Sequence, residues 1–216
     1  MLFDLRGKRR RAVQATYLML AVLMGGGLVF FGIGGDVSGG LLDAFKGGGG
    51  GDNGNELVEK RIDRNKKAAD AGNERALKAV VRDYYQLATS QTSSSSTGFP
   101  DSAKDELRNS GIYWKRYLKV AEKPDSSLAR LAVQVYSAIN KPKDAEEAAQ
   151  IIAQTDNDAA SYLGLVQYAT LAGDKRTANL AALKAVDLAP KSQKKQVKLQ
   201  ADQLKQAGTQ PQAQGG

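Results

Sequence analysis

Residues 12–33 form an unbroken run without a charged side chain, and no other feature restricts the possible folds of this chain as strongly. As an α-helix the run would be about 33 Å long, close to the thickness of the hydrocarbon core of a bilayer. Inside lipid, every backbone N–H and C=O has to be hydrogen-bonded within the segment, which a helix achieves. We therefore predict a transmembrane helix over residues 12–33.

The charges on either side of this run predict its orientation in the membrane. Five of the six residues in 6–11 are Lys or Arg, whereas residues 34–45 carry two aspartates and no basic residue. The positive-inside rule places residues 1–11 in the cytoplasm and everything after the span outside it. A cleaved secretory signal is the alternative, but its apolar region is shorter and it ends in a small-residue cleavage site that we do not find here. We expect a single-pass protein of the cell membrane.

A glycine-rich segment, residues 34–55, follows the predicted span and contains five consecutive glycines at 47–51. This composition is typical of a flexible tether, whose ends would lie roughly 25 Å apart on average. Residues 56–207 form the body of the chain, and residues 208–216 are predicted to be a disordered tail. The predicted order is thus cytoplasmic N-terminus, anchor, tether, folded domain and tail.

The body is predicted to be all-α. Ala, Leu, Lys, Gln and Glu dominate it, apolar residues recur every three or four positions, and no stretch shows the alternation of a strand. Clusters of Gly, Pro, Asn and Asp divide the pattern into short helices. The predicted helices cover residues 56–70, 74–89, 103–121, 126–138, 143–153, 158–171, 175–188 and 192–207.

The spacing of these breaks indicates a repeat, and residues 159–192 are its clearest copy. Its apolar, small and turn positions are occupied by Tyr162, Leu165, Gly173, Ala178, Ala185 and Pro190. This pattern resembles the tetratricopeptide repeat (TPR) family, in which small residues stand where the two helices of a hairpin touch and a proline ends the hairpin.

Two earlier segments resemble the same repeat. One covers residues 125–158, with its first helix marked by Leu128, Leu131, Ala132 and Val135. The other begins near Glu74, with Leu77, Val80, Val81 and Tyr84. The resemblance implies an α–α superhelix of about three hairpins with residues 192–207 as a C-terminal capping helix. Helical hairpins that do not form a superhelix are the alternative.

Members of this family hold extended peptides or partner helices in a concave groove lined by the first helix of each hairpin. The resemblance therefore implies a scaffold or adaptor that binds polypeptide. Transferred to this chain, the predicted partner-binding residues are Arg75, Lys78, Arg82, Tyr85, Gln86, Tyr136 and Gln167. The three basic residues suit an acidic segment or a C-terminal carboxylate. Ordinary solvated surface is the alternative for them.

The composition argues against catalysis. The chain contains no His and no Cys, which excludes His- and Cys-dependent catalysis, zinc sites of the usual ligands and disulfides. The dense acidic groups are predicted at helix starts, where carboxylates complement the helix dipole: Asp101, Asp105 and Glu106, and the pair Glu146 and Glu147. We predict no enzymatic activity, no metal site and no cofactor.

One predicted helix carries three aromatic residues, Tyr113, Trp114 and Tyr117. Their position favours packing in the core over a stacking platform for carbohydrate or nucleic acid, with an exposed role left open for Tyr113. The lysines within residues 191–198 are predicted to form a solvated face of the cap. Because this segment would lie outside the cytoplasm, we expect no nucleic-acid partner.

The function expected from the sequence is a membrane-anchored protein-interaction module outside the cytoplasm. In its topology the chain resembles bacterial ancillary proteins of the secretion translocon and of envelope assembly. The alternative is a structural envelope protein. In that case its basic surface would contact anionic lipid or a cell-wall polymer, since residues 56–216 carry 25 Lys and Arg against 19 Asp and Glu.

Overall fold

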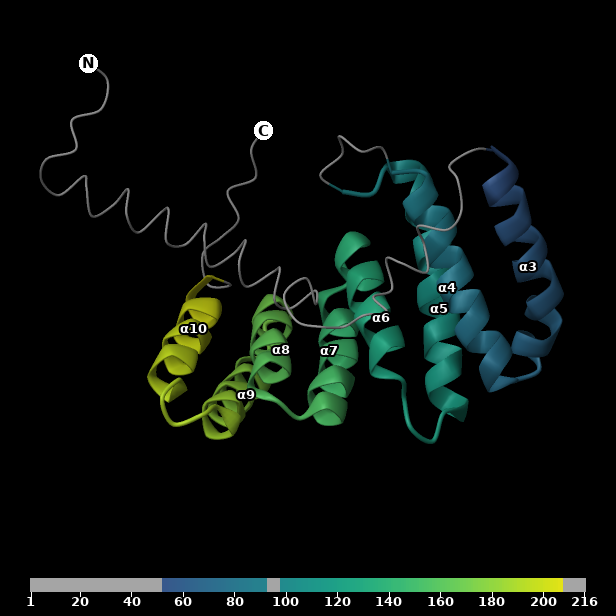
Figure 1. Cartoon of the computed structure of the whole chain (residues 1–216). Coiled ribbons are helices and arrows are strands. Elements are labelled where there is room, and N and C mark those ends of the chain that lie inside the picture. Colours follow the sequence, from purple (N-terminus) through teal and green to yellow (C-terminus); the bar gives the residue numbers. More distant parts are fainter. Residues whose placement is uncertain (1–51, 93–97, 208–216) are drawn as a thin grey trace, which may run out of the picture. The chain divides into compact units, whose positions relative to one another are not determined.

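The computed structural model describes residues 52–92 and 98–207, and this part of the chain is all-α, as predicted. Eight α-helices lie within these ranges, and Figure 1 shows them side by side in a row that follows the chain order. They are α3 (Asp52–Asp70), α4 (Glu74–Ser90), α5 (Lys104–Val120), α6 (Ser126–Ala138), α7 (Pro142–Asp156), α8 (Ala159–Leu171), α9 (Lys175–Leu188) and α10 (Lys194–Ala207).

The predicted helix boundaries agree with the structure to within four residues. The ranges of α6 and α9 are as predicted, whereas α3 begins at Asp52, within the glycine-rich segment assigned to the tether. A 3₁₀ turn, Asp101–Ala103, precedes α5. Helix α7 begins at Pro142, because a proline at the first helical position has no N–H to leave unpaired. This start places Glu146 and Glu147 beyond the first turn, which corrects their predicted position.

Short polar side chains cap the N-termini of four of these helices. Asn73 accepts a hydrogen bond from the Ala76 N–H at 2.9 Å, and Asp125, Asp158 and Asp174 each accept from backbone N–H groups in the first turn that follows. These bonds satisfy donors that have no partner inside the helix. The Asn and Asp residues at the breaks between helices therefore also cap the N-terminus of the helix that follows.

Two tight connections use backbone conformations that favour glycine. Gly72 lies between α3 and α4 with φ of 85°, and Gly173 lies between α8 and α9 with φ of 79°. A side chain at either position would strain the backbone. Asn140 and Asn157 adopt the same left-handed region at the ends of α6 and α7, which asparagine tolerates better than most residues.

The helices pack chiefly against their neighbours in the chain. Each of α3 to α9 contacts the helix that follows it, α4 also contacts α6, and α10 contacts both α8 and α9. Figure 1 shows α3 and α10 at opposite ends of the row. Serial packing of this kind means that each apolar face is buried by adjacent helices rather than by one central core.

The interior is rich in alanine between α6 and α9 and aromatic around α5. Trp114 and Tyr117 are buried with their ring centroids 5.4 Å apart. The predicted core assignment for these two residues is confirmed. The exposed role left open for Tyr113 is wrong, because this residue is buried and its hydroxyl donates to Asp70 at 3.0 Å.

A close approach of backbone and ring joins α5 to α6. The Tyr136 hydroxyl donates to the Gly111 carbonyl at 2.9 Å, and a Cβ placed on Gly111 would lie 2.9 Å from Tyr136 Cε1. Only glycine leaves room for this contact. The pair fixes how closely the two helices pack.

The predicted anchor, residues 12–33, lies outside the described residues, as do most of the predicted tether and the tail from residue 208. Across residues 52–92 and 98–207, none of the helices has the length and apolar character needed to cross a membrane.

Replacing Trp114 by alanine tests the aromatic core. Trp114 is 2% exposed, so Trp114→Ala should lower the free energy of unfolding of the full chain by about 3–5 kcal/mol. Ile112 is on the same helix and 50% exposed, so Ile112→Ala should change it by about 0.5 kcal/mol or less. Urea denaturation followed by circular dichroism measures both. Equal effects of the two changes would contradict the assigned core.

Candidate partner-binding face

The predicted partner-binding residues come from three helices, and the structure links these helices directly. The Tyr85 hydroxyl on α4 donates to the Gln134 side-chain oxygen on α6. Burial raises the pKa of Tyr168 on α8, and a hydrogen bond with Ser137 on α6 partly offsets that rise. We call the surface of α4, α6 and α8 around these contacts the α4–α6–α8 face.

Most of the basic charge predicted on this face is already paired. The Lys78 ammonium lies 2.8 Å from Glu74, and this hydrogen bond is the main reason that the pKa of Lys78 is raised. Arg82 lies 3.6 Å from Asp125. Arg75 is exposed and forms no ion pair with the residues described. Two of the three basic residues predicted for the groove, Lys78 and Arg82, are therefore already neutralised.

Tyr85 and Gln86 are both held by side chains around them. Tyr85 is half-buried, its ring meets Phe99 edge-on at 6.0 Å, and burial raises its pKa to about 12. Gln86 accepts a hydrogen bond from Arg61 at 2.8 Å, which draws it towards α3. Of the two, Tyr85 contributes to the link between α4 and α6.

The remaining two predicted residues, Tyr136 and Gln167, differ in how accessible their side chains are to solvent. Tyr136 is 4% exposed and its hydroxyl is bound to Gly111, so it serves the packing of α5 on α6 rather than a partner. Burial also raises the pKa of Tyr136. Gln167 on α8 is half-buried and accessible. The structure thus brings Arg75, Lys78, Arg82 and Tyr85 together on α4, and leaves Gln167 as the accessible residue predicted on α8.

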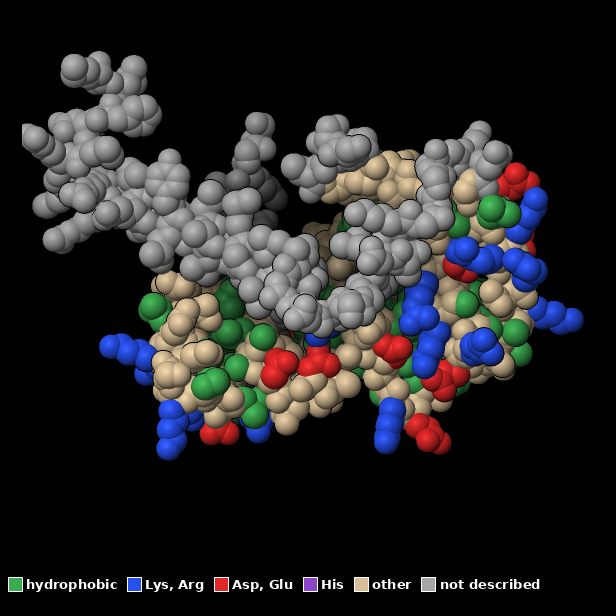
Figure 2. Space-filling view, viewed as in Figure 1, with side chains coloured by type: hydrophobic (Ala, Val, Ile, Leu, Met, Phe, Trp, Pro, Cys, Tyr) green, Lys and Arg blue, Asp and Glu red, His purple; other side chains and the backbone are tan. Residues whose placement is uncertain are grey.

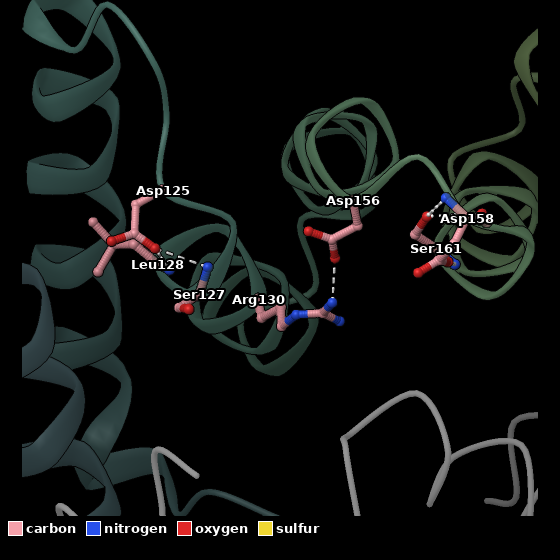
Figure 3. Close-up of polar contacts among 7 residues, drawn as sticks. All are labelled: Asp125, Ser127, Leu128, Arg130, Asp156, Asp158 and Ser161. Atoms are coloured by element: carbon pink, nitrogen blue, oxygen red, sulfur yellow. Dashed lines mark hydrogen bonds and ion pairs between the residues drawn. The ribbon is translucent and has the colours of Figure 1, made fainter. Parts of the chain in front are cut away.

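Three polar residues of α6 belong to this face: Arg130, Gln134 and Ser137. Ser137 stands at a groove position that the family resemblance implies, whereas Arg130 and Gln134 were not predicted. Arg130 pairs with Asp156 at the end of α7, as Figure 3 shows beside the capping residue Asp125. Their spacing of four and three residues in an otherwise apolar helix places them on one side of α6. The same spacing in the sequence indicates Arg130 and Gln134, which do not stand at groove positions of the family.

Across residues 52–92 and 98–207, His, Cys, Asp and Glu do not form any group of three that would hold a metal ion. Glu146 on α7 is a carboxylic acid whose pKa is raised, first by burial and then by the nearby Asp174. Hydrogen bonds from Thr177 lower the pKa of Asp174. Asp174 thus stays ionised as the cap of α9, and its charge favours the protonated form of Glu146.

Family models, curated proteins and solved structures give no match to this chain. The arrangement of residues on the α4–α6–α8 face is therefore the basis for assigning a function.

The shifted pKa of Glu146 has a consequence for stability. A carboxyl group whose pKa is raised by folding stabilises the folded state below its unfolded pKa, and this contribution is lost as the pH rises through the folded value. At pH 7 the ionised Glu146 therefore destabilises the domain. Glu146→Gln should raise the melting temperature at pH 7 and have little effect at pH 4, whereas Glu122→Gln, at an exposed residue, should change neither. A lower melting temperature for Glu146→Gln at pH 7 would contradict this assignment.

Proposed function

We propose that this protein is a single-pass membrane protein whose TPR-like domain binds polypeptide outside the cytoplasm. In this proposal residues 12–33 anchor the chain, residues 1–11 remain in the cytoplasm, and the glycine-rich segment tethers the helical domain. The protein acts as a scaffold or adaptor during secretion or envelope assembly. It performs no chemistry of its own.

The observation that carries the proposal is the character of the α4–α6–α8 face. Five of its polar residues are half-buried and held in place by hydrogen bonds or ion pairs: Lys78, Arg82, Tyr85, Arg130 and Gln134. Side chains that are already ordered lose little entropy when a partner binds. A row of such groups over α4 and α6, continued by the accessible Gln167 on α8, suits recognition of an extended segment.

The helix order supports a TPR-like architecture. Helices α4–α5, α6–α7 and α8–α9 follow one another as antiparallel neighbours, and α10 packs on the last pair as the predicted cap does. Gly173 and Asp174 occupy the turn of the clearest sequence copy. In such arrays the first helices of successive hairpins present one shared surface.

The chemistry of the face favours a peptide over a strongly acidic polymer. Acidic partners within the domain neutralise Lys78, Arg82 and Arg130, which leaves little free positive charge. Amide and hydroxyl groups remain beside them, notably Gln134, Ser137 and Gln167. These groups both donate and accept hydrogen bonds, as a peptide backbone requires.

A second function is a structural role in which the protein contacts anionic lipid or wall polymer. The exposed lysines at the C-terminal end support it: Lys191, Lys195 and Lys198 form no ion pair within residues 52–92 and 98–207. A contact of this kind depends on charge and should collapse as salt rises to a few hundred millimolar.

Photocrosslinking in intact cells distinguishes the two functions. A photoreactive residue at Arg75, Ser137 or Gln167 should capture polypeptide, with a yield that persists when the salt concentration is raised. Matched positions on second helices, Ile112 and Gln150, and Lys195 on the cap should give yields several-fold lower, because these exposed side chains lie off the face. Crosslinks are identified by mass spectrometry after detergent extraction.

Equal capture at all these positions, or lipid and wall material alone at Lys195, would reject the peptide-binding face. The second outcome would support the structural function. Capture of polypeptide at Arg75 but not at Ser137 or Gln167 would confine binding to α4 and contradict a shared face.

A further inference from the structure

The outer side of α9 carries an exposed stripe of four residues in the order Arg176, Leu180, Leu183 and Asp187. Their spacing of four, three and four residues places them along one face of the helix. All four are exposed, and Leu180 and Leu183 retain 58% and 70% of their accessible surface. The opposite face of α9 is buried through Ala178, Ala181, Ala182 and Ala185. Two adjacent exposed leucines on a helix that already buries its other face are not required by the domain itself.

The charges at the two ends of this stripe have no ion-pair partner within residues 52–92 and 98–207. The ion pairs formed there involve neither Arg176 nor Asp187. In α10, the helix packed beside α9, Lys205 contacts Asn179 at 3.3 Å and pairs with Asp202 at 3.0 Å. The nearest basic group along α9, Lys184, is exposed and forms no ion pair with Asp187.

The order of the stripe is self-complementary. When two copies of α9 lie antiparallel and share the midpoint between Ala181 and Ala182, Leu180 of one copy faces Leu183 of the other. In the same register Arg176 faces Asp187 of the second copy, at both ends of the contact. A two-fold symmetric contact uses the same patch on both copies, so every favourable pair occurs twice.

We propose that α9 is a self-association surface, through which two copies of this chain pair antiparallel. The leucines provide the apolar centre of the contact, and the Arg–Asp pairs at its ends fix the direction and register. This surface belongs to different residues from the α4–α6–α8 face, so the proposal does not depend on peptide binding.

The small size of the stripe sets the strength of the contact. Stable dimers generally bury more than about 1,200 Å² in total, and a contact centred on two leucines per copy falls below that. We therefore expect a weak and reversible dimer. Copies held in one membrane, as the predicted anchor would hold them, meet at a high effective concentration, at which a weak contact is populated.

Charge reversal at the two ends gives a specific test. Arg176→Asp makes both ends of the stripe acidic, and Asp187→Arg makes both ends basic, so each variant repels itself. A mixture of the two variants restores an attractive pair at both ends. Neither change should harm folding, because an acidic residue in the first turn and a basic residue in the last turn both suit the helix dipole.

The measurement is intermolecular energy transfer between full chains in detergent solution. The natural chain has no cysteine, so Lys195→Cys on exposed α10 provides one labelling site in every variant. The background chain should show transfer that rises with protein concentration. Arg176→Asp alone and Asp187→Arg alone should each associate at least about tenfold more weakly, and their equimolar mixture should recover most of the association.

Changes to the leucines complete the design. Leu180→Ser combined with Leu183→Ser should abolish the transfer, whereas Leu57→Ser should not, because Leu57 is 62% exposed on α3 at the other end of the row. Circular dichroism confirms that each variant is folded. A mixture that associates no better than the separate charge variants would overturn the proposal, as would no transfer in the background chain at any concentration. If the leucine changes abolish the transfer but the charge changes leave it unaltered, the copies associate through the leucines without the Arg–Asp pairs, and the proposed antiparallel register is overturned.

Discussion

Burial of each helix against its neighbours is the constraint on which the rest of this structure depends. The helices are short, and the main contacts join elements that follow one another in the chain. None of them buries its apolar face alone. The interior between α6 and α9 is built mostly from alanines, which let these helices approach closely. Several polar residues on the outward sides of α4, α6 and α8 are then left half-buried, among them Arg82, Gln134 and Gln167.

The helix ranges and their N-caps were predictable because they depend on residues that are close together in the sequence. Asn73, Asp125 and Asp174 cap helices at the breaks read from the sequence, and α6 and α9 have the predicted ranges. It was less predictable which side chains of the candidate site are already hydrogen-bonded or ion-paired, because their partners come from other helices. The Tyr136 hydroxyl already donates a hydrogen bond to the Gly111 carbonyl of α5. Arg82 already forms an ion pair with Asp125, the N-cap of α6. Spacing along one helix identifies which residues face outward, but not which charges are already neutralised.

The structure assigns different chemistry to different surfaces of the array. Paired charges and amide groups gather on α4, α6 and α8, whereas exposed leucines lie between unpaired charges on α9. A face with little free charge and ordered polar groups suits a peptide. A stripe whose charge order complements itself suits a second copy. Figure 2 shows charged side chains of both signs intermixed on the visible surface, consistent with internal pairing rather than one uniformly basic patch.

Hydrogen exchange on a variant weakened at one end tests serial packing most directly. Val197 on α10 is buried, and Val197→Ala should destabilise its surroundings by about 1–2 kcal/mol. If stability is shared only between neighbours, amides in α8, α9 and α10 lose protection by roughly tenfold while those in α3, α4 and α5 keep theirs. The same loss of protection from α3 to α10 would show one cooperative core, and would contradict serial packing of the helices.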